Sequence, residues 1–195
     1  MPHPPIIMPE IGRGEERKIQ KTIDACGAVA QKVAELKPDT IVLTSPHSVM
    51  YADYFHISPG KAAKGSLRRF GVPEVSIDAE YDAEFVAELE ALAFASDIPA
   101  GTLGEKDSSL DHGTIIPLSF INKKYKKYKL VRIGLSGLSF DDHYRLVMRI
   151  AEVADKLNRN VVFVASGDLS HRVSEDGPYG FAPEGVEFDR QITEA

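Results

Sequence analysis

Two short apolar runs, each followed within a few residues by a histidine, most restrict what this chain can fold into. Residues 40–44 and 160–165 are rich in valine and other β-branched residues. This composition predicts buried strands, because β-branched side chains pack well on a pleated sheet. Ser45-Pro46 ends the first strand, since proline has no amide hydrogen to donate to a neighbouring strand. The sequence therefore predicts two histidines at strand ends.

Amphipathic segments alternate with strands along the rest of the chain. Apolar residues recur every three or four positions in three segments, which predicts helices over 15–36, 82–95 and 141–157. Further strands are predicted over 74–78 and 130–136, with a short one near 54–57. Helices of this length permit parallel strand pairing. We therefore expect an α/β fold, a single domain with a mostly parallel or mixed central sheet flanked by helices.

The other segments give weaker signals. Four prolines among residues 1–9 predict an extended start without helix. Residues 51–70 are predicted to be mainly loop, and 107–119 a loop running into a helix-like or irregular segment. A further helical pattern covers 187–195.

Composition excludes several classes of protein. The net charge of −6 argues against a nucleic-acid partner. The lysine- and tyrosine-rich run 122–129 resembles single-strand binders, but a solvated connection is the favoured interpretation. The single cysteine, Cys26, excludes an internal disulfide and fits a reducing compartment. Without an apolar run of membrane-spanning length or a secretory signal, a cytoplasmic protein is predicted, with no membrane partner.

Four of the six histidines lie where binding groups concentrate. His47 and His171 follow the two strands, and ligands of open α/β sheets bind at the carboxyl ends of strands. His3 lies in a rigid proline frame, and His112 precedes a glycine in a loop. Imidazole is the commonest metal ligand and the usual proton shuttle near neutral pH. We expect His47 and His171, at the two strand ends, to share one site, and the four positions together are compatible with a metal site.

Other interpretations of these motifs are weaker. The serines of segment 166–171 lack the flanking glycines of a nucleophile elbow. The glycines of segment 134–137 lack the third glycine of a dinucleotide-binding fingerprint. His56, in a strand-like stretch, and His143, at a helix start, suit structural or solvated roles better.

The four histidine motifs, in this order and spacing, resemble the class III extradiol ring-cleavage dioxygenase superfamily, particularly its Memo-like branch. The motifs are Pro-His3-Pro-Pro, Ser-Pro-His47-Ser, Asp-His112-Gly and Ser-Gly-Asp-Leu-Ser-His171. The resemblance covers essentially the whole chain. It implies a ferrous ion held by two histidines and one carboxylate, with open positions for a catechol-type diol and dioxygen.

Each histidine acquires a role from this resemblance. His3 and His47 match the two histidine metal ligands. His171 matches the catalytic acid/base, which takes a proton from the substrate hydroxyl. His112 matches a catalytic histidine that lines the site and hydrogen-bonds substrate or oxygen. Zinc or another divalent metal also suits such ligands.

The sequence departs from the family pattern near both ends. The third ligand of the family is a glutamate well beyond the position of His171, and no residue up to 195 matches it. Relatives also place a strand before the first histidine. We therefore expect residues 1–195 to form one domain that lacks an N-terminal strand and a C-terminal segment. The sequence is compatible with a second, fused domain and with assembly into a homo-oligomer.

Three functions are consistent with these residues. The favoured one is an iron(II)-dependent extradiol dioxygenase that cleaves a small aromatic diol with dioxygen. A Memo-like protein that binds a metal or a partner without turnover is the alternative. Zinc-dependent hydrolysis is a third, because two histidines and a carboxylate also form zinc sites.

Overall fold

Three parallel strands form the centre of the fold. The computed structural model describes residues 1–194. β1 (Thr40–Ser45) lies between β6 (Lys129–Gly134) and β7 (Val161–Ala165), and both pairings are parallel. The carboxyl ends of these strands consequently meet at one edge of the sheet. The predicted α/β fold with a central parallel or mixed sheet is confirmed.

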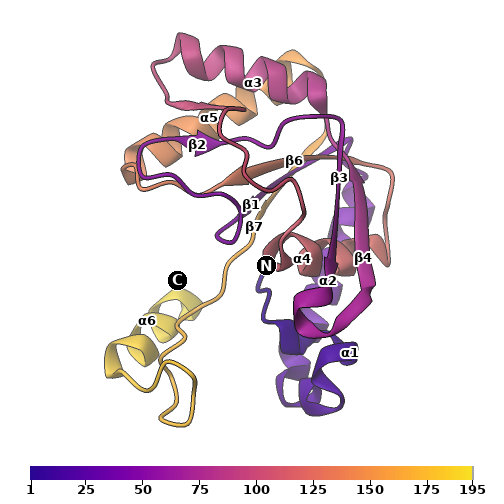
Figure 1. The fold of residues 1–195 in the computed structure, drawn as a ribbon, viewed down its shortest axis with the longest axis vertical. Coiled ribbons are helices and arrows are strands. Elements are labelled where there is room, and N and C mark those ends of the chain that lie inside the picture. Colours follow the sequence, from indigo (N-terminus) through magenta and orange to yellow (C-terminus); the bar gives the residue numbers. More distant parts are fainter. Residues whose placement is uncertain (195) are drawn as a thin grey trace.

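Helices cover both faces of this sheet. α2 (Gln20–Leu36) and α4 (His112–Asn122) pack on one face, whereas α3 (Ala83–Ala95) and α5 (Phe140–Lys156) pack on the other (Figure 1). The side chains of β1 alternate between these two layers, as the period of a strand requires. Ile41 and Leu43 join the cluster of α2 and α4, and Val42 joins that of α3 and α5.

Two smaller strand pairs complete the sheet structure. β3 (Ala62–Leu67) and β4 (Val72–Glu80) form an antiparallel hairpin joined by the 3₁₀ turn η3 (Arg68–Phe70). β2 (Phe55–His56) pairs in parallel with β5 (Ala100–Gly101). The mixture of parallel and antiparallel pairs agrees with the mixed sheet expected from the sequence.

The prediction that residues 1–9 contain no helix is wrong. Pro5–Ile7 form the 3₁₀ turn η1, and α1 (Pro9–Gly12) begins at a proline. Proline suits the first position of a helix, where its missing amide hydrogen has no helical partner to lose and its φ angle is already helical. The helix predicted over 15–36 is present, but it starts as the 3₁₀ turn η2 (Glu15–Ile19).

No pattern in the sequence indicates β3. The segment 51–70 is predicted to be mainly loop, and β3 itself contains two alanines, a lysine and a glycine, which have low strand propensity. Pairing with β4 and close packing hold it in place. A Cβ atom on Gly65 would lie 2.4 Å from the carbonyl oxygen of Leu110, so only glycine permits this approach.

The chain after β7 forms an arm that carries α6 (Pro183–Glu194) and lies apart from the layered body in Figure 1. The predicted helix over 187–195 is thus present and begins four residues earlier, while Ala195 lies outside the described residues. Of the helices in residues 1–194, none is long and apolar enough to cross a membrane.

Candidate metal centre

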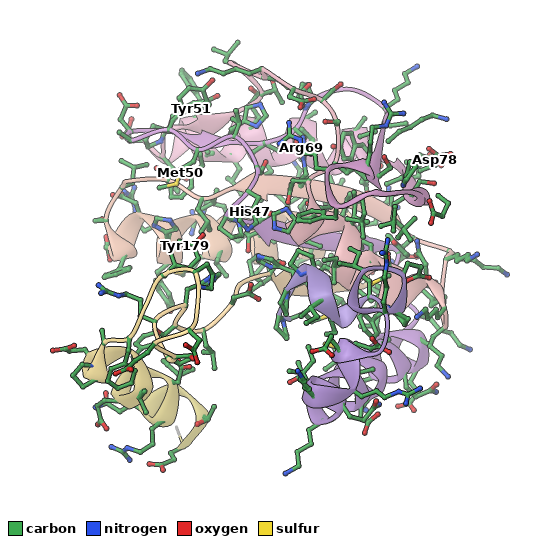
Figure 2. All side chains as sticks on the ribbon, turned by 60° about the horizontal axis from the view of Figure 1, so that its bottom comes forward. His47, Met50, Tyr51, Arg69, Asp78 and Tyr179 are labelled. Atoms are coloured by element: carbon green, nitrogen blue, oxygen red, sulfur yellow. The ribbon has the colours of Figure 1, made fainter. Side chains whose placement is uncertain are left out.

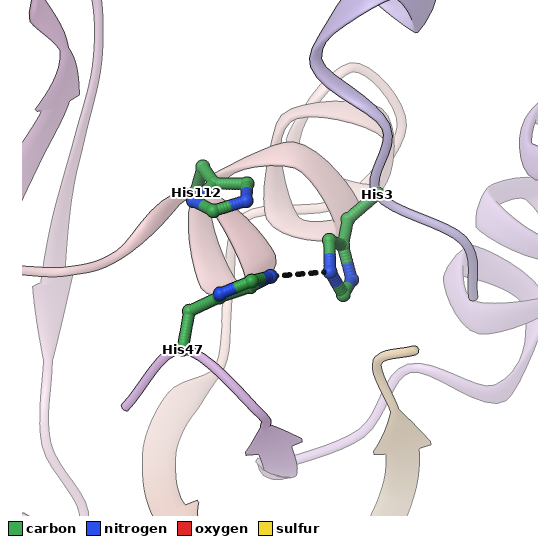
Figure 3. Close-up of side chains that lie close together, drawn as sticks. All are labelled: His3, His47 and His112. Atoms are coloured by element: carbon green, nitrogen blue, oxygen red, sulfur yellow. Dashed lines mark hydrogen bonds between the residues drawn. The ribbon is translucent and has the colours of Figure 1, made fainter. Parts of the chain in front are cut away.

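Three of the four predicted histidines meet at the carboxyl edge of the sheet. Ring nitrogens of His3, His47 and His112 all lie within 4.8 Å of one another (Figure 3). His3 is buried, His112 is half-buried and His47 is exposed. The three residues come from distant parts of the sequence, so the local fold around each must be explained separately.

His47 is positioned by the end of β1. Ser45, the last residue of that strand, accepts a hydrogen bond from the His47 amide to its Oγ atom at 3.2 Å. The same hydroxyl donates to Asp111 Oδ1 at 2.6 Å. The turn that presents His47 is therefore attached to the residue just before His112.

His112 is the first residue of α4, and Asp111 caps that helix. The Asp111 carboxylate accepts hydrogen bonds from the Thr114 amide at 3.1 Å and from its hydroxyl at 3.0 Å. Such a cap satisfies an amide that would otherwise lack a partner. Arg132 Nη1 lies 4.0 Å from the same carboxylate and helps to balance its charge. Asp111 thus fixes the turn that carries His47 relative to the start of the helix that carries His112.

His3 reaches the site because the start of the chain runs beside the end of β7. The amino group of Met1 donates to the Ala165 carbonyl at 2.5 Å, and the Gly167 amide donates to the Met1 carbonyl at 3.1 Å. The His3 amide then donates to Asp168 Oδ1 at 2.8 Å. These bonds hold His3 beside the carboxyl end of β7, where the motif of residues 166–171 begins.

The spacing of the ring nitrogens fits a shared ion. His3 Nε2 and His47 Nε2 are 3.0 Å apart. Two nitrogens that bind one ion at about 2.1 Å can lie at most about 4.2 Å apart, so this pair can reach the same ion. His112 contributes a third imidazole, with its ring centroid 4.0 Å from that of His47. The residues present therefore fit a divalent transition-metal ion.

Burial keeps two of these imidazoles neutral. Burial, together with the neighbouring His47 and His3, lowers the pKa of His112 to about 4. Burial also lowers the pKa of His3, although the Asp168 carboxylate opposes this effect. A neutral imidazole has a free lone pair, which a metal ligand needs.

His171 lies outside the three-histidine cluster. Its side chain is 57% exposed, and its ring packs edge-on against Tyr179 of the C-terminal arm. His171 Nε2 is 3.8 Å from Asp168 Oδ2, and His3 Nε2 is also 3.8 Å from that oxygen. One carboxylate therefore lies between the cluster and the predicted acid/base.

A cavity of about 830 Å³ opens beside His47 and His112. The β3–β4 hairpin supplies much of its lining, and Phe70 packs its ring against His112 with centroids 5.1 Å apart. Figure 2 shows Arg69 on the hairpin side of His47 and Tyr179 on the opposite side. A small planar ligand that entered this cavity would contact the imidazole cluster directly.

Sequence reasoning missed the supporting residues of the site. Asp111, Ser166 and Asp168 each hydrogen-bond a histidine or the segment that carries one. Each lies next to or within a recognised motif, but hydrogen-bonding partners distant in sequence leave no local pattern. Among residues 1–194, His56 is fully buried without a partner for either ring nitrogen, and neither it nor His143 belongs to the cluster.

Comparison with known proteins gives a consistent result. A family model described as the catalytic LigB subunit of aromatic ring-opening dioxygenase matches residues 1–195. The chain is 42% identical over 199 aligned residues to Protein CA_C1420 of Clostridium acetobutylicum, a name that states no activity. It is 27% identical over 186 residues to 3,4-dihydroxyphenylacetate 2,3-dioxygenase of Escherichia coli. These alignments cover 98% and 90% of this chain, but only 42% and 66% of the two relatives.

Proposed function

Because the chain belongs to the family of the catalytic LigB subunit of aromatic ring-opening dioxygenases, we propose that it forms the centre of an iron(II)-dependent extradiol dioxygenase. The proposed substrates are a catechol-type diol and dioxygen. The observation that carries this proposal is the cluster of three imidazoles at the strand ends, open to a cavity of about 830 Å³. The chain spans less than two thirds of either relative, so the activity of the whole protein is part of the proposal.

His3 and His47 are the proposed metal ligands, and His112 is the nearest further donor. A bound ferrous ion would supply a Lewis acid that acidifies the diol and a place where diol and dioxygen meet. His112 also lines the cavity, where it can hydrogen-bond the substrate or oxygen. Phe70 gives the aromatic ring of the substrate an apolar wall beside His112.

His171 is the proposed acid/base. Its exposed imidazole can take a proton from the diol hydroxyl and return it later in the reaction. The Asp168 carboxylate lies 3.8 Å from His171 Nε2 and 3.8 Å from His3 Nε2. The same carboxylate accepts a hydrogen bond from the His3 amide, so it connects the segment of His171 to the cluster.

Two arginines on the cavity wall favour a diol with an acidic substituent. Arg68 and Arg69 lie on this wall, and within residues 1–194 neither forms an ion pair. The Escherichia coli relative is named for a substrate that carries a carboxylate. Arg69→Gln is expected to lower kcat/KM for 3,4-dihydroxyphenylacetate by about 10–150-fold, the value of a charged hydrogen bond of about 1.5–3 kcal/mol. The neutral analogue 4-methylcatechol should be affected by less than about twofold.

Steady-state kinetics with both diols measure this selectivity. Arg145→Gln is the matched control, because Arg145 lies on α5 and pairs with Asp142 there. An equal loss for both diols in Arg69→Gln would contradict the assigned role of Arg69.

Oxygen uptake tests the proposed activity itself. Protein reconstituted with ferrous iron in the absence of air should consume one dioxygen for each diol opened, because a dioxygenase inserts both oxygen atoms. The same preparation loaded with zinc should consume none. If iron binds stoichiometrically and no diol from a panel of acidic and neutral catechols is opened, the proposed activity fails for this chain.

One observation favours a second candidate function. The cluster within residues 1–194 consists of imidazoles only, whereas an extradiol iron site also uses a carboxylate. Three histidines are the ligand set of several zinc sites. A Memo-like protein that binds a metal or a partner without ring cleavage would fit this donor set. Tighter binding of zinc than of ferrous iron, together with no oxygen uptake, would support it.

A further inference from the structure

A proline within α4 leaves one backbone carbonyl without its usual donor. In an α-helix the carbonyl of each residue accepts from the amide four residues later. For Gly113 that residue is Pro117, which has no amide hydrogen. Both residues are buried, so the Gly113 carbonyl needs another donor.

The hydroxyl of Ser166 supplies the missing hydrogen bond. Ser166 Oγ lies 2.5 Å from the Gly113 carbonyl oxygen and 2.7 Å from His3 Nδ1. A serine hydroxyl has one hydrogen, and a carbonyl oxygen has none. Two oxygens 2.5 Å apart attract each other only when a hydrogen lies between them, so Ser166 donates to Gly113. Its oxygen must then accept the hydrogen of His3 Nδ1.

This assignment determines which nitrogen of His3 has the free lone pair. Neutral histidine has one ring hydrogen, which is on Nδ1 when that atom donates to Ser166. The lone pair is then on Nε2, the atom that lies 3.0 Å from His47 Nε2. We propose that Ser166 is a positioning residue that holds His3 in the Nδ1–H tautomer. We further propose that Pro117 directs the Ser166 hydroxyl toward Gly113 by removing the competing amide.

The inference rests on the proposed metal site but not on ring cleavage. Its first test needs no metal, because long-range ¹H–¹⁵N correlation spectra of labelled protein identify the tautomer of each histidine. At about pH 8, where an ordinary imidazole is neutral, His3 of the unchanged protein should have its hydrogen on Nδ1. A hydrogen on Nε2 of His3 in the unchanged protein would overturn the proposal.

Variants separate positioning from packing. In Ser166→Ala, His3 should shift toward the Nε2–H tautomer, and Ser166→Thr, which keeps the hydroxyl, should restore the Nδ1–H form. Ser119→Ala is the matched control, because the Ser119 hydroxyl donates to the Ile115 carbonyl of the same helix at 2.7 Å and hydrogen-bonds no histidine of the described residues. An unchanged tautomer in Ser166→Ala would refute the role of Ser166.

Zinc affinity, measured by competition with a chromophoric chelator, gives the second readout. Removing a residue that orients a metal ligand typically weakens binding about 10–100-fold, and this loss is expected for Ser166→Ala but not for Ser119→Ala. Equal zinc affinity in the unchanged protein and Ser166→Ala would contradict the proposal. Because zinc supports no oxygen uptake, failure here is distinct from failure of the dioxygenase activity.

Pro117→Ala is expected to raise the stability of the protein and to weaken its metal binding. Alanine restores an amide for the Gly113 carbonyl and suits a helix interior better than proline, so the thermal midpoint should rise. The released Ser166 hydroxyl can then donate to His3 Nδ1, so His3 becomes a mixture of tautomers and zinc binds more weakly. A stabilised variant with unchanged zinc affinity and tautomer would refute the role of Pro117. This variant also keeps the proposal testable if Ser166→Ala fails to fold.

Discussion

His47→Ala is expected to abolish metal binding while leaving the fold intact. The His47 ring is exposed and adds little to the core, so truncation should cost little stability. It removes one of the two nitrogens that lie 3.0 Å apart in the proposed centre. Removing a residue that only orients a ligand weakens metal binding by up to roughly 100-fold. Removing a ligand itself should weaken it by more. Elemental analysis after anaerobic reconstitution with ferrous iron or zinc measures the outcome.

A second histidine variant provides the control for this prediction. His143→Ala removes an imidazole at the start of α5, where Nδ1 lies 2.9 Å from the Ser139 carbonyl and outside the cluster. It should bind metal as the unchanged protein does. Near-stoichiometric, tight metal binding by His47→Ala would refute the ligand assignment, because the remaining two imidazoles would then suffice.

His171→Phe is expected to stop ring opening without affecting metal content. The side chain is 57% exposed and its partner Tyr179 is aromatic, so phenylalanine keeps the edge-on ring contact. It removes the proposed acid/base, whose contribution to such reactions is typically about 10²–10⁴-fold in rate. Single-turnover ring opening by iron-loaded protein, with metal content measured on the same sample, separates chemistry from binding.

The competing outcome for His171 is equally clear. If His171→Phe lost the metal, His171 would be a ligand, and the arm that carries it would have to approach the cluster. Asp168→Asn is the informative partner variant, since it keeps the shape of the side chain but removes the charge 3.8 Å from His171 Nε2. A smaller loss of ring opening than in His171→Phe is expected for it, because the imidazole remains.

The layered fold was predictable because its central elements carry strong local signals. The runs that became β1 and β7 are short and β-branched, and α5 has a clear apolar stripe of Leu146, Ile150 and Val153. The β3–β4 hairpin was not predicted as such, because β3 is stabilised by pairing with β4 and by packing on Leu110 rather than by its own composition. Tertiary contacts of this kind override local propensity.

The histidines of the candidate site could be predicted from the sequence, whereas their hydrogen-bonding partners could not. His3, His47 and His112 were expected to share a site, and the structure brings them together. Their exact neighbours depended on contacts between distant segments. Asp111 bridges the turn of His47 and the helix of His112, and no periodicity of the sequence indicates such a bridge.

The pairing of the first residues with the end of β7 determines when the centre can assemble. His3 and Ser166 are 163 positions apart, so forming their contact has one of the largest loop-closure entropy costs in the fold. During synthesis Ser166 follows His3 by 163 positions, so this contact forms only after β7 has been made. Folding intermediates that lack docked β7 therefore have at most His47 and His112 available for an ion. The full set of three imidazoles therefore forms late in folding, and a bound ion would stabilise the state with β7 docked over states in which β7 is not docked.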